Sequence, residues 1–140
     1  MARNWAPRML TMATHLTDDS GWLGGDKYDW ERPAYWLRGV HDLAVLLDDK
    51  KLYAEAERWI SGIVQTQDAD GYFGERDSKC RVDSQTGQRS ADLWPHMVVI
   101  DALVSRFEHC ADERIIPLLL QFFRWCDSVP VEELIPWPEP

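Results

Sequence analysis

Two helical hairpins, repeated about 60 residues apart, limit the possible folds of this chain more than any other sequence feature. The apolar stripe that begins at Trp36 has a counterpart beginning at Trp94, and the polar turn Asp49–Leu52 has a counterpart in Asp112–Ile115. Such short turns force the flanking helices to fold back on each other as an αα-hairpin. The repeat therefore predicts an all-α fold of repeated αα-hairpins.

Apolar residues three and four positions apart predict both helices of the first hairpin. The first stripe, following Pro33, comprises Trp36, Leu37, Val40, Leu43, Ala44 and Leu47, and the second comprises Leu52, Ala56, Trp59, Ile60, Ile63 and Val64. The polar residues between them, Asp48 to Lys51, end the first helix and offer an aspartate to cap the second.

The second hairpin follows a long connection. Residues 97–107 are apolar almost all round, so this helix belongs inside a larger structure. Asp92 is its expected N-cap, and Pro95 falls in its first turn. The partner helix is expected to start at Ala111–Arg114, with a kink or a delayed start at Pro117.

Hairpins of this kind stack into an open solenoid or close into a ring, and each unit needs neighbours to cover its apolar faces. Two hairpins cannot close a ring. The segment from Met9 to Leu16 resembles the last helix of a preceding unit, and the tail IPWPEP (135–140) leads onward. We therefore expect residues 1–140 to form a single all-α domain or a fragment of a larger (α/α) barrel, whose exposed hairpin faces allow self-association.

The hairpin geometry also predicts at which end of the helices each connection lies. The short turns share one end of the hairpins, so the long connections, residues 17–33 and 68–91, should lie together on the opposite rim. They contain aromatic and charged residues, among them Trp22, Tyr28, Trp30, Glu31, Arg32, Tyr72 and Phe73. Binding and catalytic residues concentrate on long loops that a rigid frame holds, so this rim is the expected functional end.

Charge and composition exclude several classes of partner. A net charge of −9 opposes binding to nucleic acid or to an anionic membrane. The sequence contains no apolar run of about 20 residues, and its start lacks the apolar core of a secretory signal, so a cytoplasmic location is expected. Cys80, Cys110 and Cys126 form no CxxC motif and cannot all pair, which fits a reducing compartment.

The stretch GGDKYDWERPAYW (24–36) has the composition of a sugar site. Aromatic faces stack on sugar rings, and its carboxylates and cations can bind hydroxyl groups. Glycosidic cleavage uses two carboxyl groups about 5–10 Å apart, and Glu31 is the candidate catalytic carboxylate because Pro33 rigidifies the backbone nearby. The alternative is that Asp29 or Glu31 caps the following helix while Arg32 neutralises the charge.

Asp92 and His96 are spaced i, i+4, but two ligands do not make a metal site and no third is apparent, so no metal is expected. His96 is expected either to meet a ligand at the rim or to be partly buried. Cys80 has no histidine nearby in sequence and is not expected to be a nucleophile. In DGYFG (70–74), one aromatic should hold the loop onto the helices and the other is free to face the cleft.

Three segments, WERPAYWLRGVHDLAVLLDDKKL, AERWISGIVQTQDADGYFG and DLWPHMVVIDALVSRFEHCADERIIPLLLQFF, together resemble the N-terminal half of bacterial glycoside hydrolases related to β-L-arabinofuranosidase. The resemblance covers Trp30 to roughly Trp125. It implies a six-hairpin (α/α) barrel that hydrolyses glycosidic bonds of an oligosaccharide or glycan. The substrate-side residues that it suggests are Trp30, Glu31, Trp36, Arg38, Tyr72, Phe73, Trp94 and His96.

Characterised members of that family are expected to use a zinc-held cysteine from an adjacent cysteine pair, with glutamates and a Glu-x-Cys motif. This sequence contains no Cys-Cys pair, so the resemblance carries no catalytic residue over. No cofactor is expected in these 140 residues, although zinc is implied for full-length relatives. The chain is expected to be a catalytically incomplete fragment.

Two other functions remain open. The stretch around Gln67–Gly71 is similar to the Gln-x-x-Asp-Gly-aromatic repeat of terpene cyclases, another (α/α) toroid class, in which it ties helices together. Asp48-Asp49-Lys50-Lys51-Leu52 lacks the third aspartate of the metal motif of those enzymes. A non-enzymatic helical module that binds a glycan or a protein through the aromatic rim is the remaining alternative.

Overall fold

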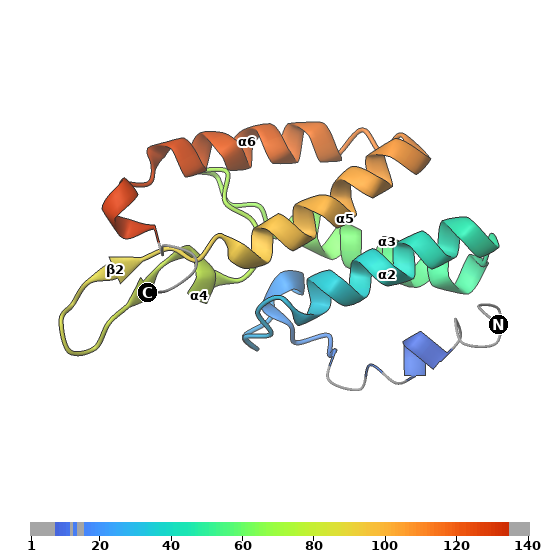
Figure 1. Cartoon of the computed structure of the whole chain (residues 1–140), viewed down its shortest axis with the longest axis horizontal. Coiled ribbons are helices and arrows are strands. Elements are labelled where there is room, and N and C mark those ends of the chain that lie inside the picture. The colour runs from blue at the N-terminus through green and yellow to red at the C-terminus, as the bar shows by residue number, and fades with distance from the viewer. Residues whose placement is uncertain (1–7, 12, 14–15, 135–140) are drawn as a thin grey trace.

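The computed structural model describes residues 8–11, 13 and 16–134 (Figure 1). The expected helix from Met9 to Leu16 lies partly outside these residues, and the tail 135–140 lies wholly outside them. Four long helices dominate the described chain, as the all-α prediction requires: α2 (Arg32–Leu47), α3 (Lys50–Gln65), α5 (Trp94–Cys110) and α6 (Ile115–Ser128). None of the described helices has both the length and the apolar composition needed to cross a bilayer.

The first hairpin forms as its sequence predicts. Helix α2 ends at Asp48, which adopts the left-handed conformation with φ of 50°. Helix α3 then begins immediately, because the Asp49 side chain accepts hydrogen bonds from Lys51 N at 2.9 Å and Leu52 N at 3.2 Å. These bonds satisfy two of the four N–H groups that a helix start leaves unpaired.

The second hairpin repeats this design with differences in detail. Helix α5 begins at Trp94, and Asp92 Oδ1 accepts the Trp94 N–H at 3.0 Å although Leu93 occupies the N-cap position. Helix α6 starts at Ile115, and Pro117 is its third residue. The helix runs on through Pro117, because the first-turn N–H groups have no intrahelical partner to lose.

Between the hairpins, the polar stretch of residues 75–90 contains short regular elements. Helix α4 (Arg76–Lys79) leads into β1 (Arg81–Val82), which pairs antiparallel with β2 (Arg89–Ser90). A single 3-10 turn, η1 (Gly21–Leu23), precedes α2, and another, η2 (Val131–Glu133), follows α6. The β-hairpin projects beyond the ends of the helices, beside η2 (Figure 1).

Helices α2 and α5 run side by side in the same direction, and α3 and α6 return from them (Figure 1). Hydrogen bonds between the two hairpins follow the sequence repeat. Arg38 Nε donates to Asp101 Oδ2 at 2.6 Å, and Ser105 Oγ donates to Asp42 Oδ1 at 2.9 Å, each across 63 residues. Equivalent positions of the two repeats therefore lie at the same level along the helices.

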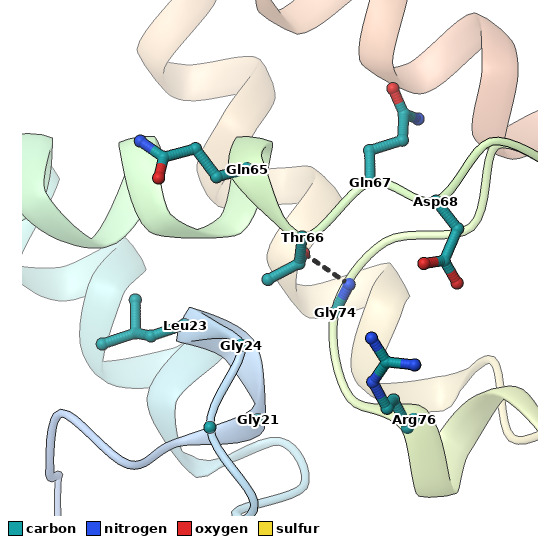
Figure 2. Close-up of a pocket in the computed structure, with 10 residues that line it drawn as sticks. Gly21, Leu23, Gly24, Gln65, Thr66, Gln67, Asp68, Gly74 and Arg76 are labelled. Atoms are coloured by element: carbon teal, nitrogen blue, oxygen red, sulfur yellow. Dashed lines mark hydrogen bonds between the residues drawn. The ribbon is translucent and has the colours of Figure 1, made fainter.

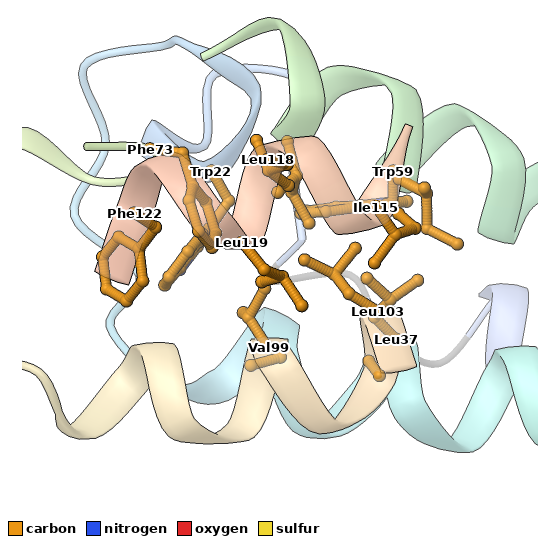
Figure 3. Close-up of a cluster of buried hydrophobic side chains, with 14 of the residues drawn as sticks. Trp22, Leu37, Trp59, Phe73, Val99, Leu103, Ile115, Leu118, Leu119 and Phe122 are labelled. Atoms are coloured by element: carbon orange, nitrogen blue, oxygen red, sulfur yellow. The ribbon is translucent and has the colours of Figure 1, made fainter. Parts of the chain in front are cut away.

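One hydrophobic core receives side chains from all four long helices and from both long connections. Figure 3 shows its centre, where Trp22, Leu37, Trp59, Phe73, Val99, Leu103, Ile115, Leu118, Leu119 and Phe122 converge. Trp22 and Phe73 come from the connections, so the core extends to the rim that carries the long loops. The rim is consequently built on packed aromatic rings.

Candidate functional site

Two crossed hydrogen bonds join the long connections where α2 and α5 begin. Trp30 Nε1 donates to Asp92 Oδ2 at 2.9 Å, and Trp94 Nε1 donates to Glu31 Oε2. The residues at the start of α2 and those at the start of α5 therefore each supply one indole and one carboxylate to the other group. The sequence predicted Trp30, Glu31 and Trp94 as site residues, and the structure brings them together.

Glu31 occupies the N-cap position of α2, but its side chain makes no capping hydrogen bond. Its carboxylate accepts the Trp94 indole N–H instead. The alternative of a capping Asp29 is also not seen, because Asp29 Oδ1 pairs with Lys27 Nζ at 2.8 Å. Glu31 is half-buried and faces the second hairpin, so it can act as a hydrogen-bond acceptor at the rim.

A buried carboxylate that the sequence analysis did not single out lies beneath this pair. Glu75 is 1% exposed, and its Oε1 and Oε2 accept the backbone N–H groups of Asp29 at 2.6 Å and Trp30 at 2.9 Å. Burial is the main cause that raises the pKa of Glu75 to about 7, and nearby Asp29 and Asp77 raise it further. Glu75 opens a polar loop, and nothing in that composition signals a buried residue.

Tyr72, Phe73 and His96 are buried, so none of them is open to a ligand in this structure. His96 stacks on Phe122 with ring centroids 4.7 Å apart, and its Nε2 lies 2.7 Å from the Phe73 carbonyl oxygen. Burial lowers the pKa of His96 to about 4, which keeps the ring neutral. The expectation that one aromatic of DGYFG faces a cleft is corrected, because both rings pack under the loop against Trp125 or Phe122.

Two glycines allow that packing. Gly71 and Gly74 have φ of 101° and 92°, which favours glycine over other residues. A Cβ at Gly71 would lie 2.4 Å from the Gln121 carbonyl oxygen, and one at Gly74 would lie 2.4 Å from the Trp22 ring. Gln67 Nε2 ties the same loop to α6 by donating to Leu118 O at 3.0 Å.

Trp36 and Arg38, also predicted as substrate-side residues, take no part in the crossed pairs and have other partners. Trp36 Nε1 donates to Met9 O at 3.1 Å, and its ring meets Trp59 edge-on with centroids 5.5 Å apart. Arg38 binds the carboxylates of Asp42 and Asp101. Its charge is therefore already compensated within the chain.

Two polar pockets flank the loops at this end. The larger, of about 300 Å³, lies between the end of α3 and the loop of η1, and Figure 2 shows the hydrogen bond from Gly74 N to Thr66 Oγ1 at 2.8 Å on one wall. The smaller, of about 130 Å³, reaches Glu75. They share Gly21, Gly25 and Arg76, and so form neighbouring hollows.

A zinc site of the kind implied by the resemblance does not fit the described residues. In residues 8–11, 13 and 16–134, no three His, Cys, Asp or Glu side chains are grouped to hold a metal ion. Cys80, Cys110 and Cys126 are separate free thiols, and Cys80 Sγ accepts a hydrogen bond from Arg89 Nε at 3.2 Å. We therefore assign no step to a metal ion.

Comparison with known proteins identifies the family. Residues 2–134 match the family model described as "Beta-L-arabinofuranosidase, GH127 catalytic domain". The chain belongs to this family. Searches of curated proteins and of solved structures found no match. The family consists of six-hairpin (α/α) barrels, which agrees with the all-α hairpins of this chain and confirms the resemblance to glycoside hydrolases.

Proposed function

We propose that this chain supplies part of the wall of a sugar cleft in a glycoside hydrolase of β-L-arabinofuranosidase type, acting on an oligosaccharide. The observation that carries the proposal is the crossed pairing of Trp30 with Asp92 and of Trp94 with Glu31. It gathers indole rings and carboxylates at one end of parallel helices, and this is the mixture that sugar binding uses.

In this function, the half-buried indoles of Trp30 and Trp94 offer ring surface to a sugar, and Glu31 offers an acceptor to its hydroxyl groups. The buried cluster of Tyr72, Phe73 and His96 supports the rim from below. Hydrolysis needs two suitably spaced carboxyl groups or an activated nucleophile. Since neither is assigned among the described residues, we propose a substrate-contact role without the complete catalytic apparatus.

Titration of the isotopically labelled chain with arabinofuranose-containing oligosaccharides tests this role. The indole N–H resonances of Trp30 and Trp94 should shift in a saturable way, whereas that of Trp59 in the core should not. Weaker binding by Glu31→Gln, with Glu132→Gln unchanged, would support the role of Glu31. Unmoved Trp30 and Trp94 resonances at high sugar concentration would exclude it.

Turnover provides a second test. We expect no hydrolysis of aryl glycosides by this chain alone. Robust turnover that survives Cys80→Ala but disappears in Glu31→Gln would overturn the proposed incompleteness and would make Glu31 a catalytic residue.

An exposed apolar stripe supports a second function, the packing of this chain against another helical hairpin, including that of a second copy. Ile116, Leu120 and Phe123 lie on the outer face of α6, and Leu120 is 54% exposed. At the 63-residue spacing, Leu120 corresponds to Glu57 of α3, which forms ion pairs with Arg106 and Arg114 of the second hairpin. The stripe thus corresponds to a surface that contacts the neighbouring hairpin in the first repeat.

The terpene-cyclase alternative has one supporting contact. Gln67 Nε2 binds the carbonyl groups of both Gly71 and Leu118, which is the helix-tying role of the similar motif in those enzymes. The larger rim pocket is lined mainly by glycines and polar residues, which suits a hydrated ligand better than an isoprenoid. Family membership also favours a sugar ligand over an isoprenoid.

A further inference from the structure

The backbone of Trp30 is held in a conformation that a tryptophan rarely adopts. Its φ is 54°, in the left-handed region, where a residue with a side chain pays a cost of order 1–3 kcal/mol. Such a conformation persists only when the surroundings over-determine it. Three distant groups do so here: Glu75 accepts its N–H, Trp22 Nε1 donates to its carbonyl oxygen at 2.7 Å, and Asp92 accepts its indole N–H.

Glu75 accepts hydrogen bonds from two consecutive backbone N–H groups of the 17–33 connection, those of Asp29 and Trp30. Within the described residues, neither of the other two partners does so. Glu75 is itself fixed. Its carbonyl oxygen accepts the Tyr72 hydroxyl, and the preceding Gly74 has no room for a Cβ beside Trp22. Through this buried side chain, the 68–91 connection fixes two successive backbone N–H groups of the 17–33 connection.

The left-handed turn at Trp30 directs the chain into α2, so it also determines where the next residue, Glu31, begins that helix. Neighbouring acceptors do not duplicate this function. Asp92 binds the indole ring and Asp29 is paired with Lys27, so neither fixes the Trp30 amide. Loss of the Glu75 carboxylate would leave the strained residue without this acceptor for its partly buried N–H.

We propose that Glu75 is a positioning residue of the rim: by fixing the left-handed Trp30 backbone, it sets where the Trp30 indole and the Glu31 carboxylate point. The role in sugar binding rests on the proposed function, whereas the role in fixing Trp30 rests on the contacts alone. Glu75 is buried and does not itself touch the sugar.

Amide hydrogen exchange and oligosaccharide binding, measured on the full chain, test the two parts separately. In Glu75→Ala, the protection factor of the Trp30 amide against exchange should fall at least tenfold, while that of the Leu103 amide in α5 should not change. Oligosaccharide affinity should fall by a similar factor. Asp77→Asn, which changes an exposed neighbouring carboxylate, is the matched control and should alter neither quantity.

The proposal is overturned if Glu75→Ala leaves the exchange protection of the Trp30 amide unchanged. It is also overturned if that protection is lost but the variant keeps its full affinity for the sugar. If the parent chain binds no oligosaccharide, the proposed function fails and the exchange result alone decides whether Glu75 positions Trp30. Where Glu75→Ala does not fold, Glu75→Gln is used, because it keeps one acceptor oxygen.

Discussion

Trp30 donates its indole N–H to the carboxylate of Asp92 over 2.9 Å, across 62 residues of sequence. The reverse pair, Trp94 to Glu31, spans 63 residues, so both bonds connect the start of α2 with the start of α5. Neither hairpin alone can satisfy its own rim indole. The rim is therefore a product of the repeat, and the contacts that form it also fix one hairpin against the other.

The Trp30–Asp92 hydrogen bond should contribute about 1–2 kcal/mol to the free energy of unfolding, because it is partly buried and its acceptor is a carboxylate oxygen. A double-mutant cycle with Trp30→Phe and Asp92→Asn, followed by urea unfolding, measures this coupling. The cycle is needed because Asp92 also accepts the Trp94 backbone N–H. Pairing Trp30→Phe with Asp127→Asn, an exposed residue on α6, should give no coupling.

Gly74 should tolerate alanine much less well than Gly87. Both glycines have a positive φ, of 92° and 72°, so an alanine at either position costs about 1 kcal/mol in backbone strain. Only at Gly74 would the new Cβ overlap the Trp22 ring, at 2.4 Å, whereas nothing lies within 4 Å at Gly87. We expect Gly74→Ala to cost at least about 2 kcal/mol more than Gly87→Ala in thermal or urea unfolding. Equal losses would mean that Trp22 moves aside freely.

The hairpins could be predicted from the sequence because helix signals are local. The apolar spacing of Leu37, Val40 and Ala44, and the capping aspartate Asp49, each act within one or two turns of chain. The family likewise follows from ordered segments of sequence. These features need no knowledge of which residues meet in space.

The chemistry of the rim could be predicted only in part, because it depends on contacts over 45 residues and more. Trp30 and Glu31 were visible as an unusual composition and Trp94 through the family resemblance, but their partners were not. Glu75 resembled any exposed loop carboxylate until two backbone N–H groups from another connection were found to meet it. Tyr72 and Phe73 were expected to divide between core and cleft, yet both side chains enter the core where α6 supplies aromatic partners.

Ionisation of Glu75 should make the chain less stable as pH rises from 4.5 to about 7. The pKa of Glu75 in the folded chain is about 7, against an ordinary value of 4.5, so the folded state binds the proton more tightly than the unfolded state. By linkage this opposes folding by about 3 kcal/mol once the group is ionised. Glu75→Gln removes this contribution. Between pH 5 and pH 7, the free energy of unfolding measured with urea should therefore rise more, or fall less, in Glu75→Gln than in the parent.

Protonation of His96 should act in the opposite direction. The pKa of His96 in the folded chain is about 4, below the ordinary value of 6.5. Its contribution to the free energy of unfolding is therefore fully present above pH 6.5 and is lost as pH falls towards 4. The loss amounts to about 3 kcal/mol. It offsets the Glu75 contribution between pH 4.5 and 6.5. His96→Phe, which keeps an aromatic ring, should leave a stability that declines with rising pH in that window. A profile identical to that of the parent would contradict the neutral, buried state of His96.

Leu120→Glu should weaken self-association of the chain without lowering its stability. The side chain is 54% exposed at the centre of the α6 stripe, so a carboxylate there stays solvated in the monomer but must be desolvated when another hairpin covers it. Light scattering over a range of concentrations should show association in the parent and a monomer in the variant, with the two melting temperatures within a few degrees. Val82→Glu makes the same change on β1, where the valine is 59% exposed outside the stripe, and should associate like the parent. If Leu120→Glu and Val82→Glu reduce association equally, the effect comes from added negative charge and the α6 stripe is not the contact surface.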